Sequence, residues 1–337
     1  MPPPVTYADI AREAGVSRMT VSLALRNHPD VSKATAERVR KIAERLGYRP
    51  DPEINRLMAY LRTSRESRAD TVVAFLDHWP RDPAIPDRYH LQLLYQGAQA
   101  RCKALGFRAD MLWLKEPGMT QRRMNSILYT RGIRGVLIPP LPTGRGHLTL
   151  EWNKFSSVVM DDVMKPDLHR VTADQFGNAQ TAFRQLRKLG YRRIGFIESR
   201  FLDEKVDHAY SAAFYWHNAQ MKASERLPPL ILPQVTPAAV AKYVRKYSPE
   251  ALVSMMHESF LERAGLRVPQ DVALATLYTT RSDGSAAGIN PLPALLGSAA
   301  VDLLVGLLLR NEVGVPDHFK HVRLRGVWVN GATAPGR

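Results

Sequence analysis

Two short amphipathic patterns separated by a glycine turn lie near the start of the chain and constrain its fold more than any other feature. Apolar residues recur at the spacing of one helix face in residues 10–14 and again in residues 21–25. Gly15 begins the turn between them, and Thr6 and Ser17 stand where helix N-caps are expected. Two short helices joined by such a turn are typical of a helix-turn-helix unit, whose second helix enters the major groove of DNA. The sequence therefore predicts a DNA-binding N-terminal domain.

A third helix is expected directly after this unit. Ser32 precedes residues 33–46, whose apolar residues form one stripe, and Gly47 is placed to end the helix. Basic residues occupy the other side, which is usual for a solvated helix face. Lys33, in the first turn, is the basic residue best placed to reach a DNA phosphate.

The spacing of many residues in this region resembles the LacI (lactose-repressor) family of bacterial transcription regulators. The N-terminal residues that carry the resemblance are Thr6, Asp9–Ala11, Ala14–Ser17, Thr20–Ser22, Asn27, Val31–Ser32, Thr35, Val39, Leu46–Tyr48 and Pro50. The matching residues farther along are Asp174, Gly177, Leu189–Tyr191, Ile194, Gly265–Leu266, Val268–Pro269, Asp271–Val272, Gly288–Ile289 and Gly297. The resemblance therefore extends over essentially the full length.

The resemblance implies which residues contact DNA. Arg18, Met19 and Leu23 match the positions that read base edges. Arg18 suits a bidentate contact with guanine, whereas Met19 and Leu23 can contact only apolar groups such as a thymine methyl. The residues expected to contact phosphates or to fix the position of the domain are Thr6, Ser17, Thr20, Ser22, Asn27, Ser32 and Lys33.

Residues 50–68 are expected to form a hinge helix and linker between a DNA-binding domain (1–49) and a core (69–337). A helix of about ten residues is marginal alone in water, so it needs a partner surface. The resemblance implies that it pairs with its dimer mate and inserts Leu57 into the minor groove, flanked by Asn55 and Met58. The alternative is that its apolar stripe docks on the core.

From residue 71 onward, apolar strands alternate with helical patterns. This alternation predicts an α/β core of parallel sheets flanked by helices and arranged as two lobes. Ligands in such folds bind at the carboxyl ends of the strands. The resemblance implies that this core is like a periplasmic binding protein, with an effector pocket between the lobes.

The predicted pocket departs from the family. Ala209 and Tyr278 stand where many members carry a ligand-binding arginine and aspartate, and residues 257–266 leave little room for the usual helix. Asp161 matches an acidic pocket position, so a ligand is expected to contact Asp161 and a ring such as Trp79 or Tyr278. The candidate pocket residues are Asp77, His78, Trp79, Asp161, Asp162, Glu198, Ala209, His257, Glu258 and Tyr278. The ligand therefore differs from a simple sugar or purine, or the protein uses none.

Several other classes of protein are disfavoured. A single cysteine excludes an internal disulfide framework, and no signal peptide is expected because the first residues contain no apolar stretch that resembles one. No later segment is expected to be long enough to span a membrane. His257-Glu258 lacks the second histidine of a zinc-protease motif, and no nucleotide-binding or nucleophile-elbow motif occurs. We therefore expect neither an enzyme nor a cofactor or metal site.

The sequence favours a cytoplasmic, homodimeric transcriptional regulator, most simply a repressor that binds a pseudo-palindromic operator. A net charge of +15 is consistent with a polyanionic partner, although the charge is spread along the chain. An unidentified small molecule is expected to modulate the affinity for DNA. Two alternatives stay open at this stage, a small-molecule binding protein and a DNA-binding protein with an inert core.

Overall fold

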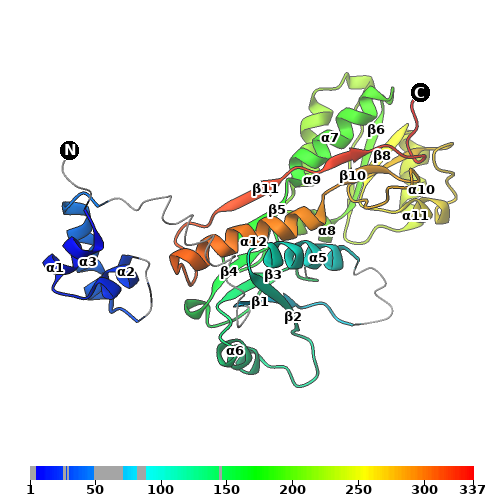
Figure 1. The fold of residues 1–337 in the computed structure, drawn as a ribbon. Coiled ribbons are helices and arrows are strands. Elements are labelled where there is room, and N and C mark those ends of the chain that lie inside the picture. The colour runs from blue at the N-terminus through cyan, green and yellow to red at the C-terminus, as the bar shows by residue number, and fades with distance from the viewer. Residues whose placement is uncertain (1–4, 26–27, 29, 49–70, 82–88, 144–145) are drawn as a thin grey trace.

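The computed structural model describes residues 5–25, 28, 30–48, 71–81, 89–143 and 146–337. It consists of a small N-terminal three-helix unit, called the headpiece below, and a core of two lobes (Figure 1). Each lobe is built around one six-stranded sheet. The expected hinge, with Asn55, Leu57 and Met58, lies outside the described residues.

The headpiece contains α1 (Tyr7–Ala14), α2 (Arg18–Leu25) and α3 (Lys33–Arg45). These helices pack around their own small core, in which Ile10, Val21 and Val39 are fully buried. Each helix alone is too short to be stable in water, so packing on this core is what holds the unit together.

Side chains at the helix ends fix the turns of the headpiece. The Asp9 carboxylate accepts hydrogen bonds from the Thr6 backbone N at 3.0 Å and from the Thr6 hydroxyl at 2.6 Å. Gly15 ends α1 with φ of +64°, a left-handed conformation that glycine adopts without a steric penalty. The Ser17 hydroxyl then accepts a hydrogen bond from the Thr20 N at 3.0 Å and caps α2. The predicted helix-turn-helix geometry is confirmed.

The first lobe, called the N-lobe below, has a parallel sheet in the order β11-β5-β4-β3-β1-β2. Its strands are β1 (Thr71–Asp77), β2 (Phe107–Trp113), β3 (Gly135–Ile138), β4 (Ser156–Val159), β5 (His169–Ala173) and β11 (His321–Leu324). Its helices are α5 (Tyr89–Ala104), α6 (Gln121–Thr130), α12 (Pro293–Arg310) and the 3-10 turn η1 (Trp152–Lys154). The central strands β1 and β3 are largely apolar and buried because helices cover the sheet.

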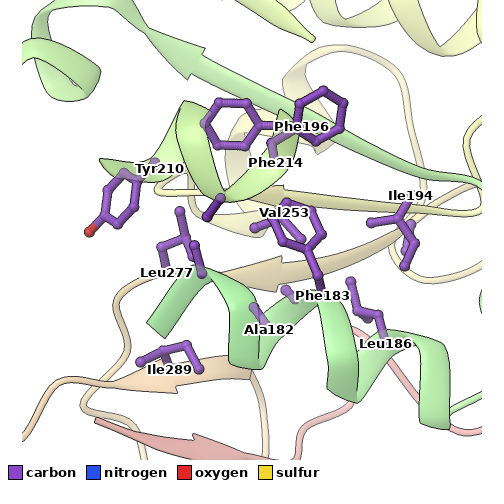
Figure 2. Close-up of a cluster of buried hydrophobic side chains, with 14 of the residues drawn as sticks. Ala182, Phe183, Leu186, Ile194, Phe196, Tyr210, Phe214, Val253, Leu277 and Ile289 are labelled. Carbon is purple, nitrogen blue, oxygen red and sulfur yellow. The ribbon is translucent and has the colours of Figure 1, made fainter. Parts of the chain in front are cut away.

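The second lobe, called the C-lobe below, has the strand order β12-β10-β9-β8-β6-β7, with β12 antiparallel to β10. Its strands are β6 (Ile194–Ser199), β7 (Leu230–Leu232), β8 (Ala251–Ser254), β9 (Ala273–Thr276), β10 (Ala287–Asn290) and β12 (Val327–Val329). Its helices are α7 (Gln175–Lys188), α8 (Arg200–Lys205), α9 (Ala209–Ala219), α10 (Pro237–Tyr247), α11 (Glu258–Arg263) and the 3-10 turn η2 (Ala223–Glu225). Between α7, α9 and the sheet, the rings of Phe183, Phe196 and Phe214 form the centre of an apolar cluster (Figure 2).

Helix α12 corrects one expectation from the sequence. Its 18 residues are long and apolar enough, by length and composition, to cross a membrane. In the structure this helix instead packs on α5 and on the N-lobe sheet, and it buries residues such as Leu304. A Cβ on Gly97 would meet the Ala294 carbonyl oxygen at 1.9 Å, and a Cβ on Gly297 would meet the Leu94 carbonyl oxygen at 2.0 Å. The two glycines therefore allow the two helix backbones to touch.

The chain crosses between the lobes three times, at the junctions β5–α7, β10–α12 and β11–β12. Asp174 caps α7 at the first crossing by accepting a hydrogen bond from the Gly177 N at 2.9 Å. The same carboxylate forms an ion pair with Arg325 of the third crossing at 2.7 Å. The next residue, Gly326, donates a backbone hydrogen bond to the Asn178 side chain at 2.8 Å. Two of the three crossings are thereby tied to each other.

Candidate DNA-binding surface and interlobe cavity

The exposed face of α2 carries the three predicted base-reading residues. Arg18 and Met19 form the first turn and are exposed, and 67% of the surface of Met19 is accessible. Leu23 is half-buried and lies four residues after Met19, on the same face of the helix. An exposed methionine this large has no packing role in the headpiece, so this face is free to contact another molecule.

Thr6, Ser17, Ser32 and Lys33, four of the predicted phosphate-contacting residues, lie at the N-termini of the headpiece helices. Thr6, Ser17, Ser32 and Lys33 are exposed, whereas Thr20 and Ser22 are half-buried and Asn27 lies outside the described residues. The Ser32 hydroxyl accepts a hydrogen bond from the Thr35 N at 3.2 Å, as Ser17 does at α2. Helix N-termini attract anions because their unpaired N–H groups and dipole are positive.

A cavity of about 530 Å³ lies between the two lobes, at the carboxyl ends of their strands. Five of the ten predicted pocket residues line it, namely Trp79, Asp162, His257, Glu258 and Tyr278. The remaining lining includes leucine, methionine, valine and proline side chains from both lobes. The volume is in the range of about 300–1,000 Å³ that small-molecule sites usually have.

Aromatic rings from both lobes face one another across the cavity. The Trp79 indole N–H donates to the Pro140 carbonyl oxygen at 2.6 Å, which fixes the orientation of the ring. The Trp79 ring meets His90 edge to face, with centroids 5.4 Å apart. His90 in turn meets Tyr278 of the C-lobe edge to face at 6.4 Å. The cavity thus has a rigid aromatic wall that spans the two lobes.

Asp161 does not line the cavity, although the sequence analysis predicts that it contacts a ligand. Its side chain is inaccessible and accepts hydrogen bonds from the backbone N of Leu141 and of Val163, both at 3.0 Å. It also forms an ion pair with Lys205, which reaches across from α8 of the C-lobe. Lys205 additionally donates to the Thr143 carbonyl oxygen at 3.0 Å. The expected contact between Asp161 and a ligand stays a prediction, and it would require Lys205 to move.

Two other carboxyl groups are buried close to the cavity. Asp162 accepts hydrogen bonds from the Thr172 hydroxyl at 3.1 Å and from the Gln175 amide at 3.5 Å. Burial raises the pKa of Asp162 to about 6. Glu198 does not line the cavity and accepts backbone hydrogen bonds from Ser199 at 2.8 Å and Met255 at 3.0 Å. Burial raises the pKa of Glu198 to about 7.

The loop after β8 forms a helix, which corrects the expectation that residues 257–266 leave little room for one. This helix, α11, has six residues and begins after His257. Its first residue, Glu258, pairs with Arg281 at 2.7 Å, and Arg281 also contacts His257. A short helix with polar residues at its start therefore closes one side of the cavity.

Asp77, His78 and Ala209, which the sequence analysis also predicts to line the pocket, lie near the cavity lining but are not part of it. Asp77 accepts a hydrogen bond from the Trp79 backbone N at 3.0 Å and shapes the turn that presents the indole ring. His78 is half-buried, its Nδ1 has no hydrogen-bond partner among the described residues, and burial lowers its pKa. Ala209 begins α9 and does not line the cavity. Its neighbour Tyr210 does line it and donates to the Gln175 side chain at 2.8 Å; Figure 2 shows its hydroxyl pointing away from the phenylalanine rings.

Sequence reasoning missed several residues that line the cavity. These are His90, Thr172, Gln175, Phe201, Lys205, Tyr210 and Arg281. Tyr210 directly follows Ala209, which matches a ligand-binding position of the family. Including the neighbours of that position among the candidates would have identified Tyr210. Lys205 and Arg281 carry no local signal, because their partners lie 44 and 23 residues away in the chain.

Comparisons with known proteins agree with this arrangement. A family model described as bacterial regulatory proteins of the lacI family matches residues 6–51. The HTH-type transcriptional repressor CytR of Escherichia coli (strain K12) is 26% identical over 290 residues, which cover 80% of this chain and 78% of CytR. The HTH-type transcriptional regulator GalR of Lacticaseibacillus casei is 27% identical over 216 residues, which cover 62% of this chain and 59% of GalR.

Solved structures share the whole fold. A transcriptional regulator CelR–cellobiose complex aligns over 98% of this chain and 99% of its own, with a TM-score of 0.55 and 19% identity. A lac repressor dimer bound to operator and the anti-inducer ONPF aligns over 99% of this chain and 100% of its own, with a TM-score of 0.54 and 16% identity. The headpiece and the two lobes therefore occur together in proteins of known structure.

Proposed function

This chain is a member of the LacI family of transcriptional regulators, and from that premise we propose that it acts as a homodimeric repressor. Each headpiece would read one half of a pseudo-palindromic operator, because the symmetry of a dimer is matched by the symmetry of its site. A small molecule in the interlobe cavity would change the affinity for DNA. The observation that carries the proposal is the family match over residues 6–51, on a headpiece whose reading face is exposed.

We assign the following roles to three parts of the chain. Residues 1–49 bind DNA, residues 50–68 link the domain to the core, and residues 69–337 form the dimer and hold the effector. Arg18, Met19 and Leu23 would contact bases, and the exposed hydroxyls at the helix N-termini would contact phosphates. The protein would act in the cytoplasm and would not be an enzyme, as its relatives are transcriptional regulators.

Selection of bound sequences from a random DNA pool tests the proposal. The full-length protein is expected to enrich a two-fold symmetric site, and its complex with that site is expected to contain two chains. Enrichment of an unsymmetric sequence, or binding that shows no sequence preference, would contradict it.

The coupling to a small molecule is tested separately on the selected site. If an effector binds with different affinity to the free and the DNA-bound protein, DNA must change the affinity for the effector by the same factor. A compound that binds the cavity yet leaves DNA affinity unchanged would favour the alternative of a DNA-binding protein with an inert core.

A further inference from the structure

We propose that the interlobe cavity binds an uncharged aromatic molecule, which packs against the wall formed by Trp79, His90 and Tyr278 and donates a hydrogen bond to Asp162. This inference rests on the proposed function, in which the cavity holds the effector. It assigns the chemical class of that effector from the lining of the cavity.

The apolar and aromatic walls of the cavity favour a planar ring. Trp79 is fixed by its hydrogen bond to Pro140, so its ring surface is already oriented for a ligand. Leu94, Met160 and Phe201 add further apolar surface to the lining. A planar ring gains both apolar burial and edge-to-face contacts on such a surface, at a small cost in conformational entropy.

The charged side chains of the cavity disfavour a charged ligand. Among the described residues that line the cavity, Lys205 is paired with Asp161 and Arg281 is paired with Glu258. An anionic ligand would have to take one of these cations from its own carboxylate. Breaking the Lys205–Asp161 pair would leave the inaccessible Asp161 carboxylate uncompensated, which is costly. A cationic ligand could pair with Asp162, but it would lose its hydration among the apolar lining, a penalty that can exceed the gain from the pair. The cavity therefore favours a ligand with no net charge.

Several polar groups that a sugar would need are already hydrogen-bonded within the protein. The Thr172 hydroxyl is hydrogen-bonded to Asp162 and to the His321 ring, and the Gln175 side chain accepts from Tyr210. The Thr276 hydroxyl bonds to the backbone of Tyr278. A hexose would bury several hydroxyls against groups that are already engaged, and unpaired buried hydroxyls are unfavourable.

Asp162 is the polar group that remains suited to a ligand. Its two hydrogen-bond donors, Thr172 at 3.1 Å and Gln175 at 3.5 Å, leave lone pairs on both carboxylate oxygens. Its raised pKa reflects this incomplete solvation. A single amide or hydroxyl donor on the ligand would supply the missing hydrogen bond.

Four compounds that differ in charge and in hydrogen-bond donors test the inference by calorimetry on the full-length dimer. 2-Naphthamide is neutral with a donor, 2-acetylnaphthalene is neutral without a donor, 2-naphthoate is the anionic counterpart, and D-glucose is the sugar. We expect 2-naphthamide to bind at least tenfold more tightly than 2-naphthoate, and D-glucose to bind most weakly. Asp162→Ala should weaken 2-naphthamide and leave 2-acetylnaphthalene unchanged.

The aromatic wall is tested with Trp79→Leu, which should weaken 2-naphthamide at least tenfold. The matched control is Trp216→Leu, because Trp216 is 58% exposed on α9 and does not line the cavity. If Trp79→Leu fails to fold, Tyr278→Leu removes a ring from the opposite lobe with the same expected loss. Equal loss in the Trp216 control would contradict the assignment.

Three outcomes would overturn the inference. 2-Naphthoate could bind more tightly than 2-naphthamide, D-glucose could bind more tightly than 2-naphthamide, or neither neutral naphthalene could bind the folded protein. Each is read without DNA, whereas the proposed function is read from selection of a symmetric DNA site. A protein that selects such a site but binds none of the neutral probes would retain the proposed function and lose this inference.

Discussion

The headpiece and the interlobe cavity satisfy their polar groups in opposite ways. In the headpiece, serine and threonine hydroxyls cap helices from three residues away and stay exposed, and Arg18 and Lys33 extend into solvent. In the cavity, charged side chains are paired with other side chains of the core, as Lys205 is with Asp161. The headpiece is therefore prepared for a polyanion, whereas Lys205 and Arg281 of the cavity lining are already paired with carboxylates of the protein.

The contrast also predicts that mutations in the two regions have different effects on binding and on stability. An exposed charge is well solvated, so its removal affects binding more than folding. Removing one member of a charged pair inside the protein leaves the charge of its partner uncompensated, so it lowers the stability of the fold.

Lys205→Ala should destabilise the protein by about 3 kcal/mol, because it leaves the inaccessible Asp161 carboxylate without its cation. Urea unfolding of the full chain measures the change. The headpiece supplies the control, since Lys41 and Glu37 form an exposed pair on α3 and Lys41→Ala should cost well under about 1 kcal/mol. The double variant Asp161→Asn/Lys205→Met should recover part of the loss. Similar losses for Lys205→Ala and Lys41→Ala would remove the contrast.

Glu198→Gln tests the buried carboxyl next to the cavity. The pKa of Glu198 is raised from 4.5 to about 7, so the folded protein keeps a proton that the unfolded chain releases. Its contribution to stability is full below pH 4.5 and is lost as the pH rises through about 7. Glutamine does not titrate. The free energy of unfolding of the wild type, minus that of the variant, should therefore fall over this pH window by at most about 3 kcal/mol. A difference that stays constant in unfolding experiments from pH 4 to 8 would contradict this account.

Arg18→Ala should weaken binding to the selected DNA site by about 1–3 kcal/mol and relax the preference at one base pair. Lys33→Ala should instead weaken all sequences alike and flatten the salt dependence by roughly one unit of slope. Fluorescence anisotropy with matched and scrambled DNA separates the two. A uniform loss for Arg18→Ala would make it a phosphate contact.

Ser17→Ala should destabilise the headpiece by about 1 kcal/mol, because it removes the cap that accepts the Thr20 N–H. Thr236→Ala removes an equivalent cap from α10 of the C-lobe and is the matched control. Ser17→Ala should lower DNA affinity, whereas Thr236→Ala should leave it unchanged. Loss of DNA binding in both variants, in the same anisotropy assay, would show that the headpiece and core do not behave separately.

The same contrast explains how far the sequence predicts the structure. The caps at Thr6, Ser17 and Ser32 depend on residues three positions away, so a local pattern is sufficient to predict them. Strands such as β1 follow equally well from their unbroken apolar runs. The pairing of Lys205 with Asp161 depends on the approach of two lobes, which no local pattern records.

Two corrections have a similar origin. The sequence predicts no segment long enough to span a membrane, yet α12 is long and apolar enough to do so, and its Gly297 lets its backbone touch α5. The six-residue α11 forms because His257 caps it and Leu261 is buried, which a count of available residues does not reveal. The predicted hinge contacts at Asn55, Leu57 and Met58 lie outside the described residues and stay predictions.

The three crossings between the lobes have a consequence for the order in which the protein can be assembled on the ribosome. The apolar face of α5, which includes Leu91, Leu94 and Ala98, is covered by α12, and the synthesis of α12 begins only at Pro293. At about 5–20 residues per second, that face waits roughly 10–40 s for its cover. Strands β6 to β10 are all made during this interval. The lobe that begins later in the chain can therefore close most of its sheet first, whereas the lobe that begins earlier cannot cover α5 until its last helix emerges.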